Sequence, residues 1–335
     1  MNRKKSLAGF LISIMVFVMS FGAAGVCSAA DTFTLKTIHA WNKNSFDVKQ
    51  FLVFTEMVQK DADARYPGQL KLQDRGGSET IGNTEQVEAC RRGLVDMVYT
   101  AASYYTSIMP EMDTMSLSKL LPWEERANGL NAYLDKLHNA KAGSHYLGRF
   151  DTASLFHLFL SKPIKSVADL KGMRIRCSPT HIPFIKSVGA EPIGMPPSDI
   201  YTAMERGVVD GYVQPPYVIR DFGLVEVSKY IVVPGFYKPV SLVLINLASW
   251  NKLPKHLQDL LTENMEKAQH LAFEAYGAKY SSELASFKKE GMTVNELAAP
   301  EAAKFSEGAY NALLGVVVKK SPEEASKIEE FLNKK

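Results

Sequence analysis

The sequence lacks the motifs on which most catalytic and redox proteins depend. Its 335 residues include only three cysteines, and they contain no P-loop, G-x-G-x-x-G fingerprint, G-x-S-x-G elbow or H-E-x-x-H pair. The seven histidines form no zinc-type grouping with cysteine or with one another. We therefore expect no metal and no cofactor, and nothing in the sequence requires catalysis.

A strong charge of one sign is also missing. The formal net charge of the whole chain is +3, and Arg3, Lys4 and Lys5 account for all of it. The rest of the chain carries equal numbers of basic and acidic residues. This balance excludes a nucleic-acid or anionic-membrane partner that is attracted by bulk charge.

The N-terminus has the pattern of a secretory signal peptide. Its three basic residues precede an apolar run over residues 7–21, and small residues follow up to Ala30. We predict a cleaved signal peptide over residues 1–30 and export to the periplasm. Two alternatives remain open. An uncleaved anchor would need a longer apolar run, and lipidation at Cys27 would fit poorly after Val26.

Cysteine usage is compatible with an exported protein but does not demand disulfides. Two cysteines, Cys90 and Cys177, remain beyond the predicted signal peptide. They stand in different segments of the fold, so we expect two buried free thiols, with a single bridge as the alternative.

A repeated phrase organises the rest of the chain. Residues 89–96, ACRRGLVD, recur as residues 203–210, AMERGVVD, with five of eight positions identical. In both copies an amphipathic helix would end at a glycine, Gly93 or Gly207, and a strand would follow. A strand-like segment also precedes each helix. The repeat predicts two similar α/β lobes with a ligand cleft between them.

The aspartates that close the two phrases, Asp96 and Asp210, have two interpretations. They could act as a general acid and base, or each could order the start of a strand, and we favour the structural role.

The predicted helices and lobe boundaries place most of the chain in one of the two lobes. We predict a helix from Pro254 to about Lys289, long enough to brace both lobes, a further helix near residues 300–314, and a charged, peripheral end over residues 322–334. The first lobe is expected over residues 31–153 plus about 241–280, and the second over residues 154–240 plus about 281–335.

The second copy carries a family resemblance. Residues 169–176, DLKGMRIR, lead into residues 189–192, GAEP, and then into residues 207–211, GVVDG. With this spacing the chain resembles the DctP-like periplasmic solute-binding proteins of tripartite ATP-independent periplasmic (TRAP) transporters. The resemblance covers nearly the whole chain after the signal peptide. It implies a two-lobed, monomeric receptor that is not an enzyme and that delivers a small organic acid to integral-membrane transporter subunits.

The resemblance also implies two polar ligand contacts. Arg176 falls on the family arginine that pairs with the ligand carboxylate, and a planar guanidinium can bind a carboxylate through two parallel hydrogen bonds. The alternative for Arg176 is an internal ion pair. Gln214 stands where the family usually has asparagine before proline, and it keeps an amide that can donate to a carboxylate oxygen.

Other positions that the family uses for polar ligand contacts are aromatic in this sequence. Phe156 replaces a second arginine, and Tyr104 and Phe236 also fall on ligand positions. Trp41 follows the first predicted strand. The predicted site is completed by two neighbours of these residues, His39 and Tyr237.

These aromatic residues predict the class of ligand. A dicarboxylate or a sugar acid needs many hydrogen-bond donors, which phenyl rings do not supply. We therefore expect an aromatic or indole-type monocarboxylate. Aliphatic keto acids and dicarboxylates remain alternatives, as do an exported enzyme on the same scaffold and a ligand sensor.

Overall fold

The computed structural model describes residues 32–151 and 153–334. The predicted signal peptide and Cys27 lie outside these ranges. Among the helices of the described ranges, none has both the length and the apolar character needed to cross a membrane.

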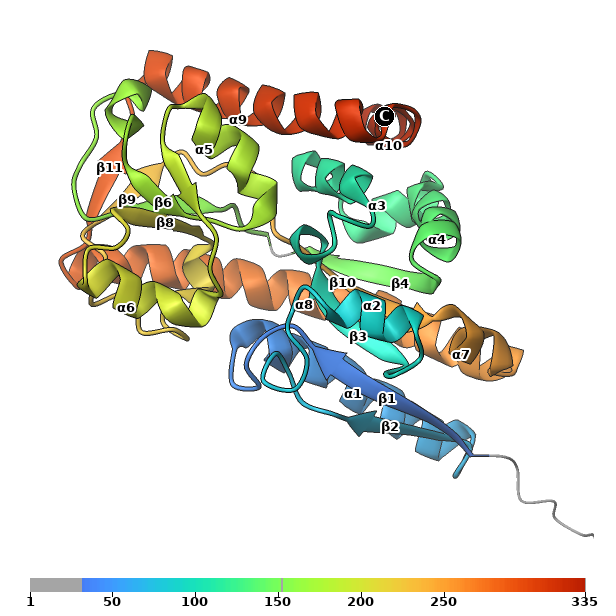
Figure 1. The fold of residues 1–335 in the computed structure, drawn as a ribbon. Helices are drawn as coiled ribbons and strands as arrows, with labels where there is room; N and C mark the ends of the chain where they lie inside the picture. Colours follow the sequence, from blue (N-terminus) through green and yellow to red (C-terminus); the bar gives the residue numbers. More distant parts are fainter. Residues whose placement is uncertain (1–31, 152, 335) are drawn as a thin grey trace, which may run out of the picture. The chain divides into compact units, whose positions relative to one another are not determined.

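The first sheet has five strands in the order β2-β1-β3-β10-β4 (Figure 1). Strand β1 pairs in parallel with β2 and β3, and β10 pairs antiparallel with β3 and β4. The strands are β1 Phe33–His39, β2 Leu70–Asp74, β3 Met97–Ala101, β4 Ser144–Asp151 and β10 Val240–Asn246. The helices adjoining this sheet in sequence are α1 Phe46–Arg65, α2 Gln86–Arg91, α3 Pro122–Ala127, α4 Leu130–Lys141 and α7 Leu247–Lys252.

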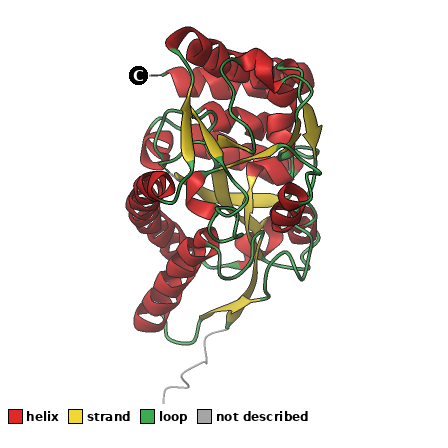
Figure 2. Cartoon of the chain, turned by 90° about the vertical axis from the view of Figure 1, so that its left-hand side faces the viewer, coloured by secondary structure: helices red, strands yellow, loops and turns green. Residues whose placement is uncertain are grey.

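The second sheet has six strands in the order β11-β9-β5-β8-β6-β7. Its pairs are also mixed, because β5 runs antiparallel to β8 and β9 while the other pairs are parallel. The strands are β5 His157–Leu160, β6 Arg174–Arg176, β7 Glu191–Ile193, β8 Gly211–Gln214, β9 Tyr230–Val233 and β11 Thr293–Glu296. Helices α5 Ile182–Ser187 and α6 Ile200–Glu205 lie in the connections between these strands (Figure 1). Figure 2 shows helices on both sides of the strands. The predicted α/β class is confirmed.

The chain passes between the sheets from β4 to β5, from β9 to β10 and through a long helix. The first two passages lie side by side, because Phe156 and Phe236 form an isolated antiparallel bridge. The long helix, α8 Lys255–Lys289, contacts α1 and β4 of the first sheet and β11 of the second. The prediction of one uninterrupted helix over this segment is therefore confirmed, and it extends along both sheets (Figure 1).

The repeated phrase performs the same structural task twice. Gly93 and Gly207 both have positive φ, at 74° and 64°, which fits the left-handed position after a helix. Asp96 Oδ2 accepts a hydrogen bond from the backbone N–H of Lys36 at 2.8 Å, and Asp210 Oδ2 accepts one from that of Arg174 at 2.9 Å. Each aspartate thus ties its phrase to the neighbouring parallel strand. This geometry supports the structural role over an acid–base pair.

The strands after the two glycines begin later than the sequence predicts. They start at Met97 and Gly211, so residues 94–95 and 208–209 belong to the turn. The side chain of the aspartate in each phrase accepts a hydrogen bond from the adjacent strand. Regular hydrogen bonding between the two strands begins only after the aspartate.

The C-terminal segment differs from the prediction. Helix α9, Ala299–Lys320, contacts α5 beside the second sheet, but α10, Pro322–Asn333, contacts α4 beside the first. Ile328 of α10 is buried in one hydrophobic cluster with Leu130 and Leu134. Helix α10 is therefore not peripheral, because the apolar face between its charged residues packs against the first sheet's helices.

Both described cysteines are buried free thiols, as predicted. Cys90 belongs to a cluster beside the first sheet and Cys177 to one beside the second.

Candidate functional site

A cavity of about 50 Å³ lies between the two sheets. It is lined by residues 101–104 after β3, residues 178–181 after β6 and residues 214–218 after β8, and the start of β10 closes it. The carboxyl ends of β3, β6 and β8 thus converge on the same space, which is where ligands bind in many α/β proteins.

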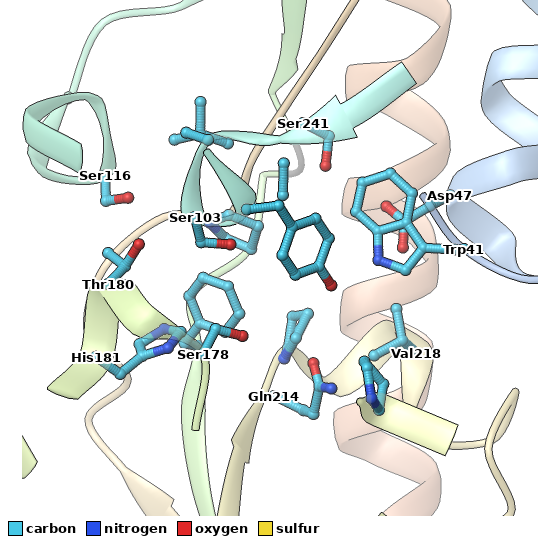
Figure 3. Close-up of a pocket in the computed structure, with 18 of the residues that line it drawn as sticks. Trp41, Asp47, Ser103, Ser116, Ser178, Thr180, His181, Gln214, Val218 and Ser241 are labelled. Atoms are coloured by element: carbon cyan, nitrogen blue, oxygen red, sulfur yellow. The ribbon is translucent and has the colours of Figure 1, made fainter. Parts of the chain in front are cut away.

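Four of the predicted site residues line this cavity. They are Trp41, Tyr104, Phe156 and Gln214. The rings of Trp41 and Tyr104 have centroids 6.0 Å apart and form an aromatic wall. Figure 3 shows the Gln214 side chain among the lining residues, and within the described chain its amide makes no hydrogen bond. Gln214 therefore has donor and acceptor capacity left for a ligand.

Arg176 is buried and does not line the cavity, but its charge acts on two residues that do, Tyr104 and His181. The side chain is 2% exposed, and its Nε and Nη2 donate to the carbonyl of Met195 at 3.0 and 2.7 Å. Nη1 has no hydrogen-bond partner, and no carboxylate of the described residues forms an ion pair with the guanidinium. Desolvation lowers the pKa of Arg176, and the nearby phenol of Tyr104 acts in the opposite direction. The internal ion pair considered from the sequence is thus absent from the described residues.

The other three predicted residues do not line the cavity. His39 is fully buried, and its Nδ1 lies 2.6 Å from the carbonyl oxygen of Trp41, so it can position that residue. Phe236 packs against Phe184 and Phe305 in the cluster beside the second sheet. Tyr237 belongs to the same cluster. The bridge to Phe156 directs residues 236–237 into the core.

The structure adds two titratable residues that the sequence did not single out, Asp47 and His181 (Figure 3). Neither ring nitrogen of His181 has a hydrogen-bond partner among the described residues. Burial lowers the pKa of His181 to about 3, and the charge of Arg176 acts in the same direction. His181 is therefore a neutral imidazole with an unused donor and an unused acceptor. Burial raises the pKa of Asp47 to about 7.

A second cavity of about 200 Å³ lies on the other side of the aromatic wall. Trp41, Pro197 and Phe222 line both cavities and separate them. A side-chain movement at this wall would join the two spaces.

A hydrogen bond ties the segment after β6 to a segment that precedes α3 in the chain. The hydroxyl of Thr180, after β6, donates to Asp113 Oδ1 at 2.5 Å. Asp113 belongs to the 3-10 segment Pro110–Leu117, which packs against α9 and α10. Burial raises the pKa of this carboxyl to about 7. An opening of the cleft would have to break this contact.

We expect His181→Phe to stabilise the ligand-free protein by about 1–3 kcal/mol, because it removes two buried polar atoms that have no partner. The replacement is compatible with the surrounding rings, among which Phe156 packs edge-on at 4.4 Å. In the unfolded chain the imidazole takes up a proton below pH 6.5, whereas in the folded state it does so only near pH 3. The wild type therefore loses stability as the pH falls below 6.5, and the advantage of the variant should grow by about 2 kcal/mol between pH 7 and pH 5.

Urea unfolding at both pH values measures this difference. His270→Phe is the matched control, since His270 is exposed and stacks on Trp123 at 4.0 Å. A loss of stability in His181→Phe at both pH values would show that the imidazole nitrogens have partners in solution.

The comparisons with known proteins agree with this geometry. The monocarboxylate 2-oxoacid-binding periplasmic protein of Nostoc sp. is 26% identical over 240 residues, which cover 67% of this chain and 64% of that protein. The 2,3-diketo-L-gulonate-binding periplasmic protein of Escherichia coli is 26% identical over 81% of this chain and 83% of its own length. Thus the match to the Nostoc protein spans a little under two thirds of that relative.

Solved structures share the fold. A TRAP periplasmic solute-binding protein from Desulfovibrio salexigens, with bound orotic acid, superposes with a TM-score of 0.78 at 22% identity. The superposition covers 90% of this chain and 97% of that chain. The family model described as bacterial extracellular solute-binding protein, family 7, matches residues 38–316. The resemblance seen in the DLKGMRIR and GVVDG segments is thereby confirmed, and the chain belongs to this DctP family of solute-binding proteins.

Proposed function

We propose that this protein is a monomeric periplasmic receptor that binds a small monocarboxylate and delivers it to the membrane subunits of a TRAP transporter. The observation that carries this proposal is the guanidinium of Arg176. It is buried with Nη1 unpartnered, and its charge acts on the lining residues Tyr104 and His181, so a ligand carboxylate would supply the missing partner and counter-charge. Export by the signal peptide predicted over residues 1–30 belongs to the same proposal.

The lining favours binding over catalysis. A nucleophile or general base would need an activating partner, such as a carboxylate beside a histidine or serine. Among the described lining residues, His181 has no hydrogen-bond partner at either nitrogen, and no serine pairs with a carboxylate. The hydroxyls of Thr180 and Tyr217 donate to Asp113 and Asp47, and we propose that these lining groups orient a ligand.

The walls favour one carboxylate over two. Arg176 supplies the guanidinium, while Trp41, Tyr104, Phe156 and Phe222 supply apolar surface. A second ligand carboxylate would lose its hydration against these rings. We propose an aromatic or indole-type monocarboxylate, whose flat ring the aromatic wall would contact on its face.

The size of the cavity favours a second candidate. A volume of about 50 Å³ holds only a few water-sized groups. A small aliphatic 2-oxo acid fits this space more easily, whereas an indole ring requires Trp41 or Phe222 to turn and join the second cavity. The 2-oxoacid-binding relative from Nostoc sp. supports this candidate.

A thermal-shift panel tests the proposal and separates the two candidates. Indole-3-acetate, phenylpyruvate, pyruvate and 2-oxoisovalerate should raise the melting temperature more than succinate, malate or gluconate. A ligand at a hundredfold excess over its Kd adds about 2.7 kcal/mol of stability. Larger shifts with a dicarboxylate or a sugar acid would overturn the monocarboxylate assignment, and the order within the first group ranks aromatic against aliphatic acids.

We also expect the ligand to close the cleft. As two bodies we propose residues 31–153 with about 241–280, and residues 154–240 with the chain from about 281 through α9. The passages bridged at Phe156 and Phe236 would be the hinge. Because a ligand that touches both bodies binds the closed form better, it shifts the population toward that form.

Small-angle scattering measures this closure as a fall in the radius of gyration when a binding acid is added. Thr180→Val, which removes the contact with Asp113, should enlarge the ligand-free particle and leave the saturated one unchanged. An identical radius with and without saturating ligand in this variant would contradict the hinge.

A further inference from the structure

Asp47 places a carboxyl group in the lining of the cavity. It stands in the first turn of α1, is 2% exposed and contacts the cavity beside Trp41 (Figure 3). Its Oδ1 accepts hydrogen bonds from the hydroxyl of Tyr276 at 2.7 Å and from that of Tyr217 at 3.4 Å. Within the described residues Oδ2 accepts none. One oxygen of the carboxyl is therefore satisfied by protein, and the other remains for a group in the cavity.

The surrounding hydroxyls are arranged to donate toward Asp47. Each phenol has a single proton, and Tyr276 directs its own to Oδ1. The hydroxyl of Tyr99 lies 3.2 Å from that of Tyr276, so it can donate to Tyr276 in turn. A line of donors that ends on a carboxyl oxygen favours the ionised form of that group.

The other titratable and charged groups around Asp47 are few. Burial is the main reason that the pKa of Asp47 is raised, and the like charge of Asp221 raises it further. Oδ2 of Asp221 accepts a hydrogen bond from the backbone N–H of Phe46. Lys49 and Lys279 act on Asp221. Among the described residues no basic side chain forms an ion pair with Asp47. In the ligand-free protein the ionised form of Asp47 therefore has no counter-charge among the described residues.

Arg176 and Asp47 are the two charged residues that act on Tyr104. The phenol of Tyr104 is influenced by the positive charge of Arg176 and by the negative charge of Asp47. Arg176 also acts on His181, which lies on the side of the cavity away from Asp47 in Figure 3. The charge of Arg176 thus acts on His181, while Asp47 lies beside Trp41, on what we call the anionic side of the cavity.

The anionic side is also rich in aromatic faces. Trp41, Tyr217 and Phe222 line the cavity together with Asp47. Aromatic faces attract cations, and desolvated sites strengthen this attraction. A carboxylate with a free oxygen next to such rings is a typical environment for an ammonium or a substituted ammonium group.

We propose that Asp47 binds a cationic nitrogen of the ligand, so that the ligand is a zwitterion of the amino-acid type with its carboxylate toward Arg176. This inference rests on the receptor function proposed above and adds the second recognition group. A zwitterion pairs both charges of the site at once. A simple monocarboxylate pairs only Arg176 and leaves Oδ2 of Asp47 without a donor.

Titration calorimetry with matched ligand pairs tests the inference. L-phenylalanine is compared with 3-phenylpropanoate, L-tryptophan with indole-3-propanoate, and L-alanine with propanoate, because the members of each pair differ only in the amine. We expect the amine-bearing member of at least one pair to bind tenfold or more tightly than its partner. Its affinity should rise from pH 6 to pH 7.5, because Asp47, with a pKa raised to about 7, must release its proton to receive the cation.

Asp47→Asn should abolish the preference for the amine-bearing member of each pair, and it should abolish the rise of that preference with pH. Asp221→Asn is the matched control, since Asp221 lies near Asp47 but does not line the cavity, and it should retain the preference. Circular dichroism and melting curves establish that both variants are folded.

The outcomes separate this inference from the receptor function. Des-amino acids that bind as tightly as their amines, or an amine preference that survives in Asp47→Asn, would overturn the role of Asp47 and leave the monocarboxylate receptor intact. Binding of neither member of any pair, and of no acid in the thermal-shift panel, would overturn both.

Discussion

Arg176→Met is expected to reduce the affinity for every carboxylate ligand by roughly 30-fold or more, while the protein remains folded. The guanidinium is buried, and its Nη1 has no hydrogen-bond partner. A ligand carboxylate that accepts a hydrogen bond from Nη1 would lose its hydration. Removal of one member of such a buried charge pair costs about 2–5 kcal/mol of binding free energy. Calorimetric titration with the strongest ligand of the thermal-shift panel measures the loss.

The same substitution should have little effect on the ligand-free protein. It removes a buried charge whose Nη1 lacks a partner, which favours the variant, but it also removes the two donors to the carbonyl of Met195. These contributions have opposite signs and similar size, so we expect a stability change of less than about 1 kcal/mol. Arg176→Lys should recover little affinity, because an ammonium cannot form two parallel hydrogen bonds with a carboxylate.

Arg174→Met is the control on the same strand. Arg174 is two residues away in β6, its side chain is 41% exposed, and it pairs with Asp210 at 3.1 Å. Its loss removes an equal charge without touching the cavity, so the affinity should stay at the wild-type value. Equal affinities in Arg176→Met and Arg174→Met would reject Arg176 as the carboxylate anchor.

The sequence predicted the parts of the fold that are specified locally. Gly93 and Gly207 end their helices because positive φ suits glycine, and this preference can be read from a single residue. Likewise, the long α8 was predictable because its 35 residues lack proline. Tyr104 was expected in the site because the family resemblance places it at a ligand position, and Trp41 was expected there because it follows the first strand.

The missed features depend on contacts between distant segments. Asp47 looks like an ordinary acidic residue in the first turn of a helix, and only the packing of Tyr276, 229 positions later in the chain, shows that it is buried and hydrogen-bonded. His181 is similar, because Phe156 and Tyr237 from two crossing segments surround it. Sequence spacing does not determine which side chains such crossings bring together.

The same limitation applies to Phe236 and to the end of the chain. Phe236 was expected among the lining residues, but its bridge with Phe156 directs it into the core. Helix α10 was expected at the periphery, because its charged residues are visible in the sequence whereas the groove beside α4 that receives Ile328 is not.

The largest stability loss is expected from breaking the buried ion pair between Arg149 and Glu125. Arg149 Nε donates to Glu125 Oε2 at 2.9 Å and its Nη2 donates to Oε1 at 2.7 Å, with both side chains almost fully buried. Arg149→Met would leave the carboxylate of Glu125 buried without this counter-charge. We expect a loss of about 3–5 kcal/mol in the free energy of unfolding, measured by urea denaturation.

A double variant and a surface pair make this measurement specific. Glu125→Leu combined with Arg149→Met removes both charges, and it should recover most of the loss because a well-packed apolar pair can replace a buried ion pair. Arg65→Met breaks the exposed pair with Glu263, in which the side chains are 39% and 47% exposed, and it should cost less than about 1 kcal/mol. A loss in Arg149→Met no larger than that in Arg65→Met would show that the buried pair is solvated in solution.

This ion pair lies next to the passage from β4 to β5 and outside the cavity lining. Its loss should therefore lower the stability of the protein without lowering its affinity for ligands. Arg149 belongs to β4, the strand that leads into the passage to β5, and Gln269 of α8 donates to its carbonyl at 2.7 Å. The ion pair joins β4 to α3, while the backbone of Arg149 is bonded to the long helix, and neither Arg149 nor Glu125 lines the cavity. At temperatures where Arg149→Met is still folded, we expect its ligand affinity to stay within threefold of wild type, whereas Arg176→Met keeps its stability and loses its affinity. A parallel loss of affinity in Arg149→Met would instead show that the start of this passage shapes the ligand site.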